Sequence, residues 1–159
     1  MREELFHPLI SHFPIAFLIT ASCLKLFLFI TLILKKEGKF TKIQTIAQAL
    51  LFAGTALLLP TIFLGDMAFE TIKQNLCEIT IAYQHEQLSE TTLMIFILGL
   101  ILQFLEYLPA WKGKFRISKE LLLVIILSLG SYYLIRTSHL GATMVYEHGA
   151  AVTNANCNS

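Results

Sequence analysis

The sequence predicts an all-α fold, a bundle of four transmembrane helices with both termini on the outer, non-cytoplasmic face of a membrane. Three observations predict it: an apolar composition, four apolar runs of membrane-spanning length, and a one-sided distribution of basic residues. Hydrophobic residues make up 55% of the 159 residues and charged residues 14%, whereas soluble domains contain about 25% charged residues. A chain this short cannot bury so much apolar surface in a water-soluble core, so a bilayer is the expected solvent.

The four apolar runs are each long enough to cross a hydrocarbon core of roughly 30 Å, which takes about 20 helical residues. They lie at about residues 13–34, 43–65, 91–110 and 121–141. The first run reads as a retained helix, because Met1-Arg2-Glu3-Glu4 is not the positive start of a signal peptide. The runs predict one membrane domain over residues 1–152, followed by a polar tail at 153–159.

The orientation follows from lysine and arginine in the short loops, because these residues accumulate on the cytoplasmic side. Eight of the twelve basic residues lie in the loops after the first and third runs: Lys35, Lys36, Lys39, Lys42, Lys112, Lys114, Arg116 and Lys119. The segment 66–90 contains five acids and only Lys73. This bias predicts a multi-pass membrane protein with the segment 66–90 outside. If the source is a bacterium, the expected location is the inner (cytoplasmic) membrane.

The segment 66–90 has its own helical pattern. Its apolar residues recur at spacings of two to four: Met67, Phe69, Ile72, Leu76, Ile79 and Tyr83. The pattern predicts a short amphipathic helix in the outer loop, or an outward extension of the third transmembrane helix. No internal repeat is evident along the chain.

Two charges fall inside the predicted spans. Lys25 and Glu106 both lie toward the inner side, where they either form an ion pair or reach the headgroups separately. Cys23 is expected to be a buried packing residue. Cys77 and Cys157 are both expected outside, where a disulfide can form; free or differently paired thiols are the alternative. The absence of a CxxCH motif argues against covalently attached haem.

All five histidines are expected at the outer face. An imidazole at the border of the apolar zone needs a partner, because burying a polar group unpaired costs a few kcal/mol. That partner is a metal ion, a haem iron or a carboxylate. The candidate ligands are His7, His12, His85, His139 and His148, with support from Asp66, Arg136, Tyr146 and Glu147.

Spacing limits how these histidines can combine. On one helix His7 and His12 are about 140° apart, so they cannot both face one small ion unless the chain turns at Pro8. His139 and His148 share a face of a continuous helix but lie too far apart to share an iron. The competing interpretation is that the histidines are interfacial and bond only to nearby carboxylates.

The sequence resembles one known family at both ends. His7-Pro8-Leu9-Ile10-Ser11-His12-Phe13-Pro14-Ile15-Ala16 resembles the opening signature H-P-x-x-x-H-F-P-I-A of DUF2231, a family of predicted bacterial membrane proteins. The stretch 141–152 resembles its closing G-G-x-L-V-Y-x-H-G-x-G-V, with Ala142 and Ala151 in place of glycines. The resemblance implies roles for His7, His12 and His148, and less directly for His85 and Asp66; His139 lies outside the motifs. Some relatives resemble fusions to cytochrome c modules, which implies a redox setting.

Three functions fit these features. The first is an electron-transfer subunit that binds b-type haem, with a cytochrome c or other redox subunit as its outer partner and possible homo-oligomerisation. The second is a copper, zinc or iron site built from His12, His85, His148 and Asp66. The third is a structural or assembly subunit. The sequence shows no hydrolase triad, phosphate loop or other catalytic residues, and a net charge of +1 argues against a nucleic-acid partner.

Overall fold

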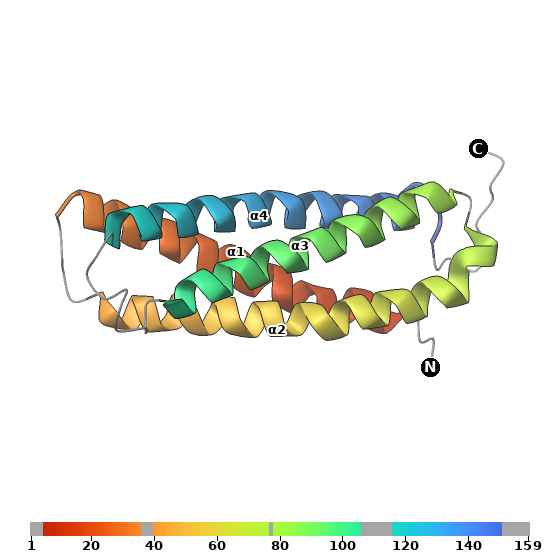
Figure 1. Ribbon diagram of the computed structural model, residues 1–159. Coiled ribbons are helices and arrows are strands. Elements are labelled where there is room, and N and C mark those ends of the chain that lie inside the picture. Colours follow the sequence, from red (N-terminus) through yellow and green to blue (C-terminus); the bar gives the residue numbers. More distant parts are fainter. Residues whose placement is uncertain (1–4, 36–39, 77, 106–115, 151–159) are drawn as a thin grey trace.

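The computed structural model describes residues 5–35, 40–76, 78–105 and 116–150, and in these residues it contains helices and no strand (Figure 1). The elements are α1 (Phe6–Ile33), α2 (Thr41–Ile72), the 3-10 turn η2 (Lys73–Asn75), α3 (Ile79–Leu105) and α4 (Arg116–Tyr146). The predicted all-α bundle of four long helices is confirmed.

Each of the four α-helices is long and apolar enough to cross a membrane, with 27 to 32 residues. Large apolar side chains cover the outside of the bundle; Phe63 and Met94, for example, are 64% and 68% exposed. Such side chains are stable against lipid but not in such numbers against water. The protein is therefore a multi-pass membrane protein that contacts the lipid bilayer.

The helices extend well beyond the predicted apolar runs at one end. α2 continues past Gly65 to Ile72, and α3 begins at Ile79. The helical character predicted for residues 66–90 is confirmed, but it belongs to the ends of α2 and α3 and to η2 rather than to a separate amphipathic helix. Gly65 does not end α2, because continuing the helix keeps the backbone hydrogen bonds intact and packs Gly65 against α1.

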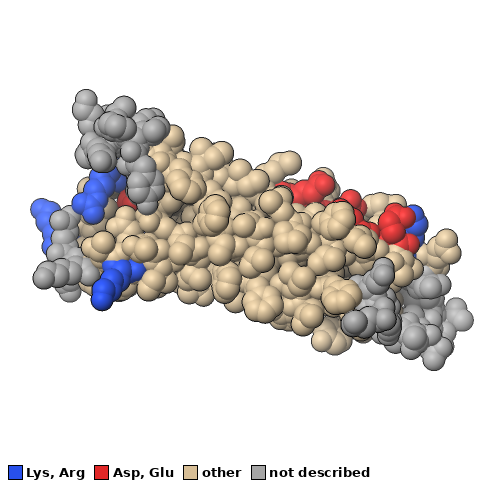
Figure 2. All heavy atoms as spheres, turned by 90° about the horizontal axis from the view of Figure 1, so that it is seen from below, with Lys and Arg blue, Asp and Glu red and all other residues tan. Residues whose placement is uncertain are grey.

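On the face that Figure 2 shows, charged residues lie at the two ends of the bundle, with an apolar belt between them. The basic end carries Lys35, Lys42, Arg116 and Lys119, with Glu120 beside them. The acidic end carries Asp66, Glu70, Glu78, Glu86, Glu90 and Glu147, with Lys73 paired to Glu70. α1 begins and α4 finishes at the acidic end.

The bundle consists of two helical hairpins, α1–α2 and α3–α4, which pack against each other less extensively than the helices within each hairpin. α2 and α4 run along opposite edges of the molecule in Figure 1, and α1 and α3 cross between them. Within each hairpin a glycine allows close approach: a Cβ on Gly54 would lie 2.7 Å from Leu18, and one on Gly130 would lie 3.0 Å from Phe96. Small residues at such crossings are the usual means of packing membrane helices.

The structure bears on two of the predictions for residues within the spans. Lys25 is only 1% exposed, so it is enclosed by the bundle and does not reach the headgroups along the outer surface of α1; Glu106 lies outside the described residues. Cys23 is exposed, which makes the prediction of a buried cysteine wrong. Only one face of α1 packs on the other helices, and Cys23 lies off that face. Cys77 and Cys157 fall outside the described residues.

The close crossing at Gly54 yields the first testable prediction. We expect Gly54→Ala to lower the free energy of unfolding by about 1–3 kcal/mol, because the added methyl would overlap Leu18. Unfolding in mixed micelles measures this change. Ala49→Leu, on the exposed side of the same helix, is the matched control and should leave stability unchanged. Equal stability of Gly54→Ala and the unaltered protein would contradict the packing described here.

Candidate functional site

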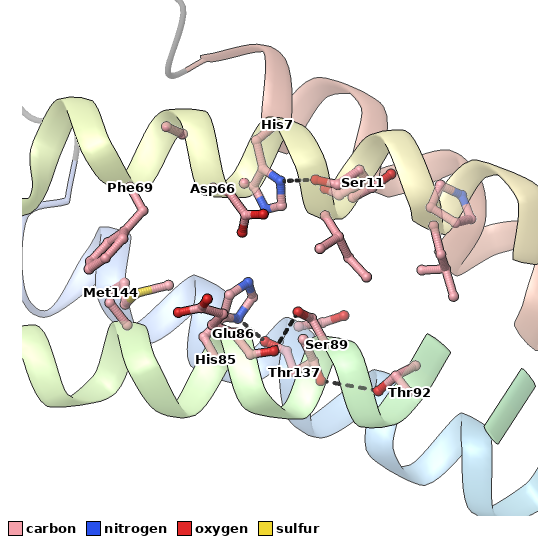
Figure 3. Close-up of a pocket in the computed structure, with 18 of the residues that line it drawn as sticks. His7, Ser11, Asp66, Phe69, His85, Glu86, Ser89, Thr92, Thr137 and Met144 are labelled. Atoms are coloured by element: carbon pink, nitrogen blue, oxygen red, sulfur yellow. Dashed lines mark hydrogen bonds between the residues drawn. The ribbon is translucent and has the colours of Figure 1, made fainter. Parts of the chain in front are cut away.

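A cavity of about 170 Å³ lies between the two hairpins in the acidic half of the bundle and is partly open to the outside. All four helices line it, mostly with apolar side chains such as Ile15, Leu58 and Leu134. Its polar lining includes His7, Ser11, Asp66, His85, Glu86 and Ser89 (Figure 3). The concentration of ionisable groups in a largely apolar cavity makes this the candidate site.

Two histidines enter the cavity from opposite hairpins, and each is fixed by a backbone carbonyl of its own hairpin. His7 of α1 bonds through Nδ1 to the carbonyl oxygen of Thr61 of α2 at 2.8 Å. His85 of α3 bonds in the same way to Thr137 of α4 at 2.9 Å. A carbonyl oxygen can only accept, so Nδ1 of each ring is the donor. In the neutral rings Nε2 therefore holds a free lone pair.

The two imidazoles face each other. Their ring centroids are 6.1 Å apart and their planes are 86° apart. Figure 3 shows the rings pointing toward one another across the cavity, each with its second nitrogen on the inner side. Two imidazoles on opposite sides of one metal ion have centroids roughly 6 Å apart, because each metal–nitrogen bond is about 2.0–2.1 Å. The spacing of His7 and His85 matches this arrangement.

Each imidazole also rests against a glycine of the neighbouring helix. A Cβ on Gly65 would lie 3.1 Å from Cε1 and Nδ1 of His7, and one on Gly141 would lie 3.2 Å from Cε1 of His85. Those distances are tight for a real side chain. Because neither glycine has a side chain, each ring can lie close to the backbone of the neighbouring helix, whose carbonyl accepts the bond from Nδ1.

Two carboxylates share the cavity with the histidines. Asp66 of α2 and Glu86 of α3 point into it, while Phe69 and Met144 lie toward the end of the bundle (Figure 3). Within the described part of the chain, no three histidine, cysteine, aspartate or glutamate side chains gather closely enough to hold a metal ion by themselves. The groups that the structure brings together as possible metal ligands are the two imidazoles, with the carboxylates nearby.

The other three predicted ligands lie outside the cavity. His12 is exposed and its Nδ1–H donates to the Pro8 carbonyl of its own helix at 2.6 Å. His139 is exposed on α4, and His148 is half-buried beyond the end of α4. His12 points elsewhere because a helix turns by about 100° per residue, which separates it from His7. The structure therefore does not assemble the predicted set of His12, His85, His148 and Asp66.

The predicted supporting residues divide similarly. Asp66 lines the cavity, whereas Arg136, Tyr146 and Glu147 are exposed and do not. Arg136 is the residue before Thr137 on α4. Because Thr137 is buried and successive residues are about 100° apart around a helix, the Arg136 side chain points outward. Tyr146, which is 86% exposed, is the last residue of α4 at the acidic end.

The closing H-G motif has a structural use at the end of α4. Gly149 has φ 64°, a left-handed conformation that glycine adopts without strain. The N–H of Ala150 then donates to the Met144 carbonyl at 2.8 Å, which satisfies one of the carbonyls left free at the end of the helix. The glycine after His148 is thus explained by the helix end rather than by ligand binding.

The sequence did not predict which groups hold the two cavity histidines in place. It placed the histidines at one face but did not identify the carbonyls of Thr61 and Thr137 as their partners. A weak signal was present: His7 and His85 are each followed four residues later by a serine, Ser11 and Ser89, on the same helical face. Both serines line the cavity.

The fold and the cavity together define a class: a four-helix multi-pass membrane protein with a paired-histidine cavity between two hairpins. Comparison with protein families matches residues 4–154 to DUF2231, described as a predicted membrane protein. The chain belongs to the DUF2231 family. Neither the curated proteins nor the solved structures include a significant match to it.

The tautomers of the two cavity histidines can be measured directly. We expect ¹⁵N spectra of histidine-labelled protein, taken at mildly alkaline pH, to show His7 and His85 as neutral rings with the proton on Nδ1, because each Nδ1 donates to a carbonyl. His7→Gln and His85→Gln assign the signals. A proton on Nε2 of either ring would contradict the geometry of the site.

Proposed function

We propose that this protein is a membrane redox protein in which His7 and His85 would hold one b-type haem between the two hairpins. The observation that carries the proposal is the pair of facing imidazoles, 6.1 Å apart, each with its Nδ1 bonded to a carbonyl. Helical bundles commonly hold cofactors through histidines on facing helices. Bound haem would supply one-electron redox chemistry.

The donor set fits a haem iron. A porphyrin supplies four nitrogens, so the protein needs to provide two ligands on opposite sides, and His7 and His85 are placed to do so. Metal-bound histidines usually donate their other ring N–H to a carbonyl or carboxylate, which fixes the ring and raises its basicity. Both cavity histidines already make such a bond.

The cavity suits a porphyrin in chemistry and only partly in size. Its apolar lining fits the macrocycle. A cavity of about 150 Å³ accommodates a molecule as small as benzene, so a cavity of 170 Å³ would hold the iron and the centre of the ring. The rest of the macrocycle would occupy the open side of the cavity, between the hairpins.

The charge distribution predicts the side of the membrane that the site faces. The basic end belongs on the cytoplasmic side by the positive-inside rule, which puts the acidic end, the cavity and both termini outside. In a bacterium this corresponds to the outer face of the inner membrane. A haem there would exchange electrons with an outer partner, such as a cytochrome c or another redox subunit, but could not alone carry electrons across the bilayer. The role is therefore electron transfer rather than independent catalysis.

A second candidate is a bare metal ion, and the carboxylates favour it. Asp66 and Glu86 point into the same cavity as the two imidazoles, with the thioether of Met144 nearby. Imidazole with carboxylate suits zinc or iron, and imidazole with thioether suits copper. Such a site would serve metal handling or sensing.

The absorption spectrum of detergent-purified protein tests both candidates. We expect a Soret band that sharpens on dithionite reduction, with resolved α and β bands typical of haem with two histidine ligands. His7→Ala and His85→Ala should each lose the reduced bands, because each removes one axial ligand. His12→Ala and His139→Ala, which alter exposed histidines, are the controls and should keep them.

A featureless spectrum, with full recovery of protein expressed under haem-replete conditions, would overturn the haem proposal. Stoichiometric copper, zinc or iron that disappears in His7→Ala and His85→Ala would then establish the second candidate. A protein with neither haem nor metal would leave the two histidines as hydrogen-bonded links between helices, in a structural or assembly subunit.

A further inference from the structure

The two hairpins repeat the same interactions in the same order. In the first hairpin the histidine and the carbonyl it bonds, His7 and Thr61, are 54 residues apart; in the second, His85 and Thr137 are 52 apart. In each hairpin the histidine lies at the acidic end of the first helix and bonds the backbone carbonyl of a threonine in the second helix. The two-residue difference falls between the matched part of the first helix and the matched part of the second, so each matched part keeps one register.

The repeat continues along the helices. Each threonine whose carbonyl accepts the bond lies four residues before the glycine that its histidine touches: Thr61 before Gly65, and Thr137 before Gly141. A second glycine lies seven residues before each threonine and packs on the first helix of its hairpin. Gly54 meets Phe17 and Leu18, and Gly130 meets the corresponding Ile95 and Phe96.

These matches overturn the expectation that the chain has no internal repeat. Most of the identical pairs lie at buried or half-buried positions: His7/His85, Ser11/Ser89, Leu51/Leu127, Gly54/Gly130, Leu58/Leu134, Thr61/Thr137 and Gly65/Gly141. The other identical pairs in the two matched stretches are aliphatic: Ile19/Ile97, Leu24/Leu102 and Leu64/Leu140. Lipid-facing positions require only an apolar side chain, so they differ freely between the hairpins. A repeat carried by so few separated residues is hard to see without the contacts that relate them.

We infer that the chain is built from two equivalent helical hairpins related by a pseudo-twofold axis along the bundle, that the histidine cavity lies on this axis, and that Gly65 and Gly141 are matched positioning residues for the two imidazoles. Parallel repeats about an axis along the membrane normal are an established way of building membrane proteins around a central site. Here each hairpin contributes one imidazole, one carbonyl and one glycine.

The carboxylates of the cavity do not follow the symmetry. Asp66 corresponds to Ala142, and Glu86 corresponds to Pro8. The symmetric part of the cavity is therefore the pair of imidazoles, and an occupant held by both imidazoles would lie on the axis. This assignment of an occupant rests on the proposed function, whereas the equivalence of the hairpins and of the two glycines does not.

Single substitutions at the two glycines test the inference. Gly65→Ala and Gly141→Ala should each displace the ring that lies 3.1–3.2 Å from the new Cβ. We expect each to weaken haem retention by a similar factor, about 10–100-fold, the usual cost of disturbing the groups that orient a metal ligand. Gly99→Ala is the matched control, because its Cβ would meet Leu127 at 3.1 Å, away from the cavity.

A second readout needs no cofactor. In ¹⁵N spectra of histidine-labelled protein, prepared without haem or metal, Gly65→Ala should shift the His7 signals and Gly141→Ala the His85 signals. Gly99→Ala should shift neither, while unfolding measurements report any loss of stability that the three variants share. These responses identify positioning effects that a general loss of packing would not produce.

The outcomes separate the two proposals. If the protein binds no haem but the ¹⁵N signals respond as expected, the haem proposal fails and the paired hairpins stand. If haem is bound but both glycine variants retain it and leave the histidine signals unchanged, the positioning roles are overturned. A large effect at one glycine and none at the other would overturn the equivalence of the two halves.

Discussion

An imidazole inside an apolar bundle must bond its N–H to something, and this requirement organises the site. Each of His7 and His85 satisfies it with a backbone carbonyl of the neighbouring helix in its own hairpin. The bond fixes both the tautomer and the direction of the ring, and so leaves Nε2 of each neutral ring directed into the cavity. Two imidazoles that would otherwise be costly to bury thereby present two opposed Nε2 lone pairs that can bind a ligand.

The close packing of the hairpins follows from the same requirement. A histidine reaches a carbonyl of the next helix only where the backbones approach closely, and Gly65 and Gly141 allow that approach. Deeper in the bundle Gly54 and Gly130 hold the helices of each hairpin together. The seam between the hairpins is less tightly packed than either hairpin, so the cavity lies there rather than within a hairpin.

The sequence predicted the helices better than the site. Four apolar runs and the charge bias were sufficient for the bundle, because span length and polarity are set by the bilayer. Helix ends were misjudged, since Gly65 is a packing residue here and not a helix terminator. Among the five histidines, sequence could place all of them near one end but could not choose His7 and His85. That choice depends on which faces of α1 and α3 meet across the bundle, a tertiary feature that helical spacing within one segment does not determine.

Electron paramagnetic resonance of the oxidised, purified protein tests most directly whether the two imidazoles hold one iron. Facing ligands with nearly perpendicular ring planes predict a strongly anisotropic low-spin ferric signal. His7→Ala and His85→Ala should each convert it to a high-spin signal or lose it with the haem. A high-spin signal in the unaltered protein, or a low-spin signal that survives both substitutions, would contradict the assignment of His7 and His85 as the ligand pair.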